Sequence, residues 1–249
     1  ELIQFDNTHC VYDWLLYVAI PVYLLTFFFF FGVMPHTPFG NLEFWCRVCT
    51  MGLICAIFAF NIGHELSHRT NEQVPVFLGQ ILLLSVLNLH FIPYHNAGHH
   101  RNVGKRTDPS TAKKGEWLYT FWFRSQIGGY LQAWQIENDR ARREGRAVYS
   151  LHNKMVQYST VTVAFLTGLY FVLEEPLFGV YLLVVFCSIC LLETINYIEH
   201  YGLVRKQTDT GKYEPVRHHH SWNSDHIFGR ALMFNLSRHS DHHYNGSQK

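Results

Sequence analysis

Nine histidines of this chain fall into four short clusters whose spacing suits metal binding. The clusters are His-Glu-Leu-Ser-His at 64–68, His-Asn-Ala-Gly-His-His at 95–100, His200 within Asn-Tyr-Ile-Glu-His, and His-Ser-Asp-His-His at 239–243. Histidines four residues apart lie on one face of a helix, and neutral imidazole is a common ligand of iron, zinc and copper. Because each of the four clusters follows an apolar run, composition alone does not explain them, and they predict a metal site.

Composition narrows the class of protein that carries these clusters. Only 16% of the 249 residues are charged, well under the roughly 25% usual for soluble domains, while 48% are hydrophobic. Long apolar segments alternate with very polar ones, which is typical of a multi-pass membrane protein. The formal net charge of +1 gives no reason to expect a nucleic-acid partner.

Four apolar runs are long enough to span a bilayer, which requires about 20 residues. These runs cover residues 14–34, 44–62, 156–173 and 177–197. The sequence therefore predicts an all-α fold, a multi-pass transmembrane helical bundle in a single integral-membrane domain that covers 1–249. Cys46/Cys49 and Cys187/Cys190 lie inside these runs, and we interpret them as packing residues rather than a redox or zinc pair.

A fifth apolar run, 74–92, has about the right length but is expected not to cross the membrane. If it crossed, the first two histidine clusters would lie on opposite sides and could not share a site. The positive-inside rule agrees, because every Lys and Arg except Arg47 lies in the polar segments that carry the histidines. We therefore expect a non-spanning helix at 74–92, covered by protein, and a histidine-rich site for two metals that faces the cytoplasm under a cap formed by 98–154 and 200–249.

Two kinds of metal chemistry compete for the clusters. The segment His64-Glu65-Leu66-Ser67-His68 matches the helix motif of zinc metalloproteases, in which Glu65 is the general base. A protease site uses three protein ligands, which leaves six or more clustered histidines without a function. Two metal ions with four or five ligands each use all nine. Iron is the natural metal because open positions on histidine-ligated iron(II) bind O2, although imidazole binds zinc as well.

Carboxylates beside the clusters are expected to orient the imidazoles rather than to bind metal. These carboxylates belong to Glu65, Glu199 and Asp241. Glu193 and Asn196 are polar residues inside an apolar run, where polarity is costly and usually faces a functional interior.

The remaining histidines have weaker patterns. His218-His219-His220 and His226 lack helical ligand spacing, so metal contact by any of them is the less favoured alternative. No role is assigned to the isolated histidines His9, His36, His90 and His152.

The four motifs resemble the signatures of the membrane-bound alkane 1-monooxygenases, which share a superfamily with the xylene monooxygenases and fatty-acid desaturases. The residues that carry the resemblance are His-Glu-Leu-Ser-His-Arg, His-Asn-Ala-Gly-His-His, Asn-Tyr-Ile-Glu-His-Tyr-Gly-Leu and Arg-His-Ser-Asp-His-His. The resemblance extends from about Trp14 to the C-terminus, and its third motif favours an alkane monooxygenase over a desaturase.

The resemblance implies a non-haem di-iron centre that inserts one atom of O2 into a terminal C–H bond of a medium- to long-chain n-alkane and so forms a 1-alkanol. It also implies that electrons come from rubredoxin, which an NADH-dependent rubredoxin reductase reduces. By motif match, the iron ligands are His64, His68, His95, His99, His100, His200, His239, His242 and His243.

The match to this family has departures. Relatives usually have Glu before the second motif, where this chain has Tyr94. They also usually have a further N-terminal helix pair and a longer C-terminal tail. The chain begins at Glu1 without Met and shows no cleavable signal peptide, so we expect a fragment or a trimmed chain in which part of the substrate channel is missing.

Helical spacing offers candidates for the wall of that channel. Ile54, Ile57 and Asn61 share the ligand face of the helix that leads into His64 by helical spacing. Ordinary helix packing is an equal alternative for each of them.

The segment 101–146 is basic, with ten Lys and Arg against five Asp and Glu. It either docks an acidic electron donor such as rubredoxin or reflects the positive-inside bias alone.

Other functions also remain open: a xylene-type methyl monooxygenase, a fatty acyl desaturase or hydroxylase, a membrane zinc protease, and a non-catalytic metal transporter or sensor. A transporter needs ligands across the membrane thickness, which clusters gathered at one face do not provide.

Overall fold

The structure of the chain is a computed structural model, and it describes residues 10–234 and 236–245. The predicted all-helical class is confirmed: these residues form helices and loops without a β-strand, and they contain one isolated bridge between Gln207 and Tyr213. His9, to which the sequence assigned no role, lies outside the described residues.

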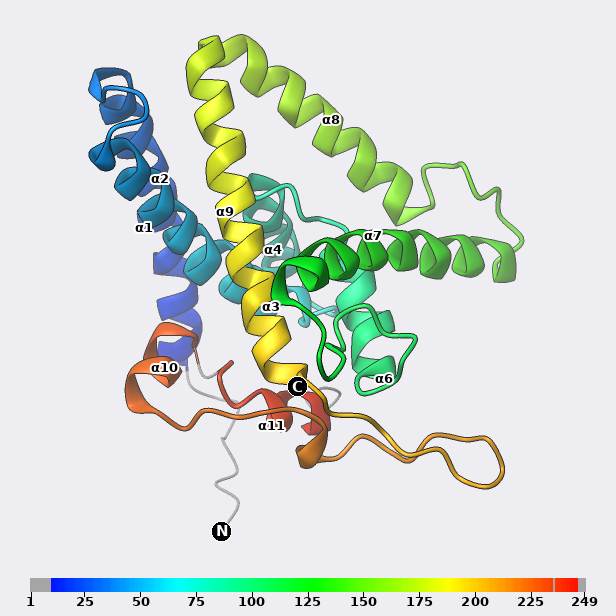
Figure 1. The fold of residues 1–249 in the computed structure, drawn as a ribbon. Coiled ribbons are helices and arrows are strands. Elements are labelled where there is room, and N and C mark those ends of the chain that lie inside the picture. The colour runs from blue at the N-terminus through cyan, green and yellow to red at the C-terminus, as the bar shows by residue number, and fades with distance from the viewer. Residues whose placement is uncertain (1–9, 235, 246–249) are drawn as a thin grey trace.

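The first part of the chain forms two long rods joined by a short turn (Figure 1). The first rod is helix α1 (Cys10–Val33), which a 3-10 turn, η1 (Met34–His36), follows. The second rod joins α2 (Leu42–Cys55), a π-helical segment η2 (Ala56–Phe60) and α3 (Asn61–Ser67) without a break.

The start of the second rod is fixed by a side-chain cap. The Asn41 side chain accepts a hydrogen bond at 2.7 Å from the backbone N–H of Phe44, one of the amides that a helix start leaves without a partner. The rod is apolar from this cap to the first histidine cluster, so His64 lies at the opposite end of the rod from Asn41.

A second pair of long helices, α8 (Lys154–Val172) and α9 (Glu175–His200), comes later in the chain. Asn153 caps α8 by accepting from the Met155 N–H at 2.9 Å. Pro176 lies in the first turn of α9, where its missing N–H leaves no hydrogen bond unmade. Figure 1 shows α9 beside the second rod and α8 slanting away from it.

The protein is an integral membrane protein by the length and composition of its helices. Among the described residues, four helical stretches are long and apolar enough to cross a membrane. They are Asp13–His36, Leu42–Ser67, Lys154–Val172 and Glu175–His200. Each overlaps one of the four runs that the sequence predicts as spans.

Helices α2 and α9 approach each other closely at Gly52. A Cβ atom on this glycine would lie 2.7 Å from the Cβ of Cys187, so only glycine permits the observed separation. Cys46, Cys49, Cys187 and Cys190 are all free thiols. Cys187 and Cys190 are half-buried on α9, whereas Cys46 and Cys49 are exposed on α2, so the interpretation of all four as packing residues stays a prediction.

The fifth apolar run forms a shorter helix than predicted. Helix α4 (Gln73–Ser85) has 13 residues and a length of about 20 Å, which is less than the roughly 30 Å of a bilayer core. The helix was expected to continue to Ile92, but it ends at Ser85, and Leu87 adopts the left-handed conformation with φ of 55°. The chain then turns back toward the second histidine cluster.

Helix α4 is held inside the bundle at its middle and at its C-terminal end. At its middle, Gly79 packs against α3, and a Cβ there would lie 3.0 Å from the carbonyl oxygen of Gly63. At its tip, the Ser85 hydroxyl lies 2.7 Å from the Tyr23 hydroxyl of α1, and the Ser85 carbonyl accepts from the Tyr181 hydroxyl of α9 at 3.0 Å. Protein therefore covers the polar groups of this helix end, as a non-spanning helix requires.

The polar segments surround the inner ends of these helices. Helix α7 (Leu118–Arg143) is one 26-residue rod, and it packs against α9 and the second histidine cluster. That cluster lies on α5 (Phe91–Pro93), a π-helical segment η3 (Tyr94–His99) and α6 (His100–Asn102). After α9 the chain passes through the turn η4 (His218–His220) and α10 (Ile227–Leu232) to α11 (His239–Asn245).

Candidate metal centre

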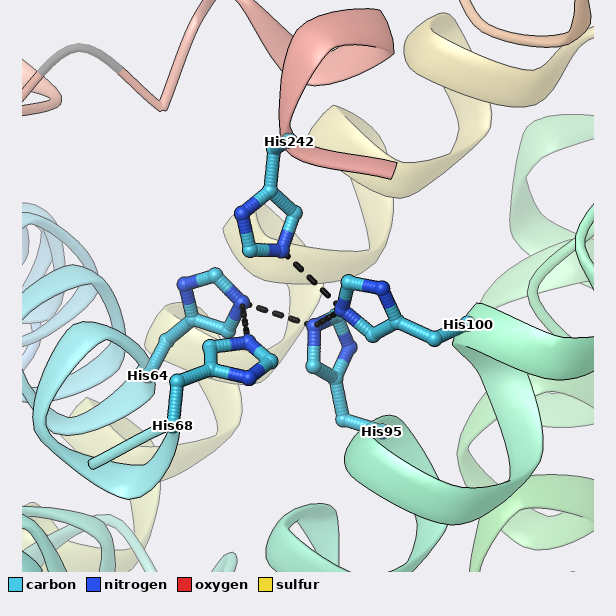
Figure 2. Close-up of side chains that lie close together, drawn as sticks. All are labelled: His64, His68, His95, His100 and His242. Carbon is cyan, nitrogen blue, oxygen red and sulfur yellow. Dashed lines mark hydrogen bonds between the residues drawn. The ribbon is translucent and has the colours of Figure 1, made fainter. Parts of the chain in front are cut away.

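The histidines of the four clusters gather into two groups, and the larger group has five members (Figure 2). This group consists of His64, His68, His95, His100 and His242. Its side chains meet through their Nε2 atoms. The Nε2 of His64 lies 2.7 Å from that of His95 and 3.0 Å from that of His68. The Nε2 of His100 lies 2.9 Å from that of His95 and 3.0 Å from that of His242.

The smaller group has four members, all of them buried. It consists of His99, His200, His239 and His243. The Nε2 of His243 lies 2.8 Å from that of His239 and 3.2 Å from that of His99, and the Nε2 of His239 lies 3.0 Å from that of His200. The two groups together contain the nine histidines predicted as ligands and draw on all four sequence clusters.

The spacing of these nitrogen atoms fits a metal coordination sphere. Ligands bound at right angles about 2.1 Å from a metal lie about 3.0 Å apart, whereas tetrahedral ligands lie about 3.4 Å apart. The neighbouring Nε2 atoms that are in direct contact lie 2.7 to 3.2 Å apart, which matches adjacent ligands at right angles, and the ligand atoms of each group all lie within 4.8 Å of one another. Hydrogen bonds do not explain the convergence, because one Nε2 has a single lone pair or a single hydrogen, and that of His64 has two such neighbours.

Burial keeps the imidazoles in the neutral form that a metal requires. Burial, and then the neighbouring imidazoles, lower the pKa of His95, His239 and His243 well below the ordinary value. The same causes lower the pKa of His100 to about 2. These side chains therefore present lone pairs at neutral pH and do not compete with a metal by binding protons.

A π-helical turn divides the second cluster between the two groups. The spacing of His95 and His99 predicts that they share a face of an α-helix, but they belong to different groups. The reason is that Tyr94–His99 is π-helical, with a wider turn than an α-helix, so His95 and His100 lie on the same side. The i, i+4 rule holds for His64 and His68, which lie in a regular helix and share a group.

The three predicted orienting carboxylates differ in what they contact. Asp241 pairs with Arg238 and, at 3.3 Å, with His218, while Glu65 lies 3.9 Å from Arg69. The carboxylate of Glu199 lies 3.5 Å from the Nδ1 of His239, a member of the four-histidine group. That separation is longer than a good hydrogen bond.

The strongest carboxylate contact comes from Asp108, to which the sequence assigned no role. Its Oδ2 lies 2.9 Å from the Nδ1 of His99 and accepts from the Thr111 hydroxyl at 2.7 Å. Burial by itself raises the pKa of a carboxyl group, but His99 and these hydrogen bonds hold the pKa of Asp108 below its usual value. A carboxylate at Nδ1 keeps the proton there, which leaves the Nε2 of His99 free for a metal. A carboxylate nine residues after a ligand was the available signal, but the sequence did not show that the chain folds back.

The family of the chain is shown by a comparison with known proteins. Residues 41–248 match the family model described as fatty acid desaturase. This chain belongs to the fatty acid desaturase family. Within its sequence relatives, the resemblance to alkane 1-monooxygenases is confirmed.

Two similar relatives are alkane 1-monooxygenases. Alkane 1-monooxygenase 1 of Alcanivorax borkumensis is 36% identical over 238 residues, which cover 93% of this chain and 57% of the relative. The alkane 1-monooxygenase of Ectopseudomonas oleovorans is 37% identical over the same shares. The hydroxylase component of the xylene/toluene monooxygenase of Pseudomonas putida is 29% identical and is covered to 52%. The chain thus spans a little more than half the length of the curated relatives it matches.

Tyr94, the residue at which the second motif departs from the expected pattern, has a role that is visible in the structure. Its buried hydroxyl lies 2.9 Å from Asp108 and 2.7 Å from the Ser110 hydroxyl, and it accepts from the Ser110 N–H at 3.0 Å. A carboxylate at position 94 would place a second negative charge near Asp108. Tyr94 instead supplies a neutral hydrogen-bond donor that supports the Asp108 carboxylate behind His99.

The π-helical segment η2 alters the predicted channel wall. Such a turn accommodates one extra residue and rotates the residues after it by about 100° relative to a regular α-helix. The placement of Ile54 on the face of His64 assumed regular α-helical spacing, and η2 interrupts that spacing between the two residues. Ile57 lies within η2 and is half-buried, and Asn61 is buried one turn before His64.

A third group of possible ligands has an ordinary explanation. Glu214, His219 and His220 lie close enough to share an ion. However, the Nδ1 of His220 accepts from the Arg217 N–H at 2.9 Å, so a neutral His220 carries its proton on Nε2, which lies 3.3 Å from Glu214. A protonated Nε2 cannot bind metal, and hydrogen bonding accounts for this contact.

The remaining polar residues singled out by the sequence belong to neither of the two groups. Glu193 is buried, and the Asn196 side chain donates to it at 3.4 Å. His218 stacks on Tyr244, and His226 stacks on Phe228. His36 and His152 belong to neither group, and His90 is buried beside Tyr130.

Deleting one residue from η2 tests whether the π turn sets the direction of the first ligand pair. Removal of Phe58 should convert the segment to α-helix and rotate His64 and His68 by about 100° relative to α2. We expect the five-histidine group to lose its metal, so that metal analysis finds about half the wild-type content per chain. Phe58→Leu keeps the chain length and should retain all metal. Full metal content in the deletion variant would contradict the assignment.

Asp108→Asn tests the support behind His99. Loss of the carboxylate should weaken metal binding by the four-histidine group by about 10- to 100-fold, as for other carboxylates that orient histidine ligands. Competitive chelator titration measures the two affinities, and that of the five-histidine group should be unchanged. Asp139→Asn, on the exposed face of α7, is the matched control. Equal weakening of both groups would show a general structural role instead.

Proposed function

We propose that this protein hydroxylates the terminal carbon of medium- to long-chain n-alkanes to give 1-alkanols, using O2 at two histidine-bound iron ions. The observation that carries the proposal is the convergence of nine neutral imidazoles, from four separate sequence clusters, into groups of five and four. A set of this size exceeds what one metal ion binds. The alkane 1-monooxygenase relatives supply the reaction class, and transfer of that class to this chain is part of the proposal.

Iron fits the donor set better than zinc. The Nε2 separations near 3.0 Å suit ligands at right angles, as in five- or six-coordinate sites, whereas protein-bound zinc prefers a tetrahedral arrangement. The proposed ligands are the five histidines of one group and the four of the other. Bound iron would supply the reduction of O2 and the oxidation of the C–H bond, in which one oxygen atom enters the alkane and the other leaves as water.

The protein itself contributes a dry, neutral and rigid setting for that chemistry. His64, His95 and His99 are each at most 5% exposed, and Phe91 stacks on His95 with ring centroids 4.6 Å apart. Such burial excludes water from the reacting carbon and holds the ligands in one geometry. The apolar spanning helices that end at this centre give an alkane a route from the bilayer, and we propose Ile57 and Asn61 as part of its wall.

The zinc protease alternative is disfavoured by where Glu65 lies. In that mechanism the glutamate of the motif faces the metal as a general base. Here Glu65 lies near Arg69, while His64 and His68 share their group with three further histidines.

The xylene-type alternative keeps some support, because a xylene/toluene monooxygenase component is also a relative, at lower identity. A fatty acyl substrate is the remaining alternative within the family.

We also propose that the centre faces the cytoplasm and receives electrons from rubredoxin, itself reduced by an NADH-dependent reductase. The basic segment 101–146 begins directly after the second histidine cluster, and the side chains of Arg101, Arg106 and Lys113 are exposed. Positive charge at this position supports the cytoplasmic orientation and attracts an acidic donor.

Metal analysis joined to a product assay tests the proposed reaction. Anaerobically purified protein should hold two iron ions per chain and convert n-octane to 1-octanol when O2, rubredoxin, its reductase and NADH are present. His99→Ala should abolish turnover. One zinc ion with peptide cleavage would overturn the proposal, and turnover of xylene but not octane would select the methyl monooxygenase alternative.

Salt dependence tests the donor surface. If rubredoxin docks by charge, raising the ionic strength from about 0.05 to 0.5 M should raise the KM for rubredoxin several-fold, since screening weakens attraction between exposed charges. Turnover with a small neutral reductant should change little over the same range and is the control. An unchanged KM for rubredoxin would leave the basic residues with a topological role only.

A further inference from the structure

A cavity of about 380 Å³ lies apart from the histidine groups, between the loop after α4, helix α7 and the start of α8. Leu87, Leu89 and His90 form its loop side, and residues of α7 and α8 complete it. Its volume falls within the range of small-ligand pockets. The outer wall contains exposed apolar side chains, with Ile127 58% and Val163 63% exposed, so the cavity opens sideways toward the region that surrounds the spanning helices.

The inner wall of this cavity is polar and incompletely hydrogen-bonded. His90 is only 9% exposed, and among the described residues its side chain makes no hydrogen bond. Within the described part of the chain, Gln126, which also lines the cavity, makes only a long hydrogen bond, in which its side chain donates to Asn88 behind the lining at 3.4 Å. Burying polar groups without partners is costly, so this wall is arranged for a polar ligand.

The chemistry of the lining narrows the class of ligand. No Lys, Arg, Asp or Glu of the described residues lines the cavity, and burial lowers the pKa of His90 to about 4, so the lining is neutral at pH 7. A neutral lining does not attract a carboxylate or a phosphate. The hydroxyls of Ser159 and Thr162 and the amide of Gln126 suit a hydroxyl group, while Leu89, Met155 and other apolar residues suit an alkyl chain.

Adjacent residues of one loop contact the cavity and the histidine groups. His90 lines the cavity, and the next residue, Phe91, stacks on His95 and contacts His64 at 5.8 Å between ring centroids. Leu87, also in the lining, keeps a left-handed backbone that is strained for a leucine. The loop 87–91 is thus shared by the cavity and the proposed active site.

We infer that this cavity binds a long-chain primary alcohol by its hydroxyl end, as the site that the product occupies between the metal centre and the membrane. The identity of the ligand rests on the proposed alkane hydroxylation, while the preference for a neutral hydroxylated chain rests on the lining alone. The alcohol hydroxyl donates to or accepts from His90 and Gln126, and its chain lies along α8 toward the bilayer.

Photolabelling tests the site without any turnover. The full protein in lipid nanodiscs, kept without reductant, is irradiated with a long-chain primary alcohol that carries a diazirine in its chain, and labelled peptides are mapped by mass spectrometry. We expect labels on residues 87–90, 126–130 and 155–163. Unlabelled 1-dodecanol should displace the probe, whereas dodecane and dodecanoate should be at least about tenfold weaker.

Variants separate a binding role from a structural one. Gln126→Leu and Thr162→Val should each weaken labelling by about tenfold, and Thr160→Val, on the exposed face of α8 outside the cavity, should leave it unchanged. His90→Phe gives a further variant if it folds. Labels elsewhere, equal displacement by dodecane, or displacement by dodecanoate or phospholipid would overturn the inference. If the alcohol binds here but octane is not hydroxylated, the proposed function fails and the site stands.

Discussion

The structure depends on one physical constraint, which is the close packing of neutral imidazoles. Nitrogen lone pairs about 3 Å apart repel one another, and charged imidazoles would repel far more strongly. Such an arrangement is stable only when something shares the lone pairs and when the backbone holds every ring in place. Protons do not share these lone pairs, because burial lowers the pKa of His95 and of the other buried histidines well below the ordinary value. A metal ion is the partner that fits.

The backbone meets this constraint by placing the ligands at helix ends that converge. Helices α3 and α9 bring His64 and His200 from the spanning region, and η3 and α11 bring the other clusters to the same place. A regular α-helix repeats every 3.6 residues and cannot direct His95 and His100 to one point. The wider turn of η3 does so, and that turn also lets His99 face the second group. The irregular helices are thus the part of the fold that makes two sites rather than one.

The second requirement is support behind the ligands. Asp108 holds the Nδ1 of His99, and Tyr94 in turn holds Asp108, so this ligand is fixed by a buried network that begins in its own π-helical segment. His64 and His243, by contrast, have Nδ1 atoms without a hydrogen-bond partner among the described residues. The ligands are therefore supported unequally even within one group, because His99 is held by Asp108 while His243 of the same group has, in the described part of the chain, no such carboxylate at its Nδ1.

The sequence by itself determined the helical class, four apolar helices of spanning length and the nine histidines that the structure gathers. Hydrophobic length and local motif spacing carry that information, because both depend on neighbours along the chain. Only the tertiary structure decided the rest. The fifth helix ends at Ser85, and His95 and His99 belong to different groups. A π-helical segment lies between Ile54 and His64, and the carboxylate of Asp108, rather than that of Asp241, contacts a histidine of the groups. Each of these outcomes depends on a π turn or a contact between distant segments, and short-range sequence patterns do not encode either of them.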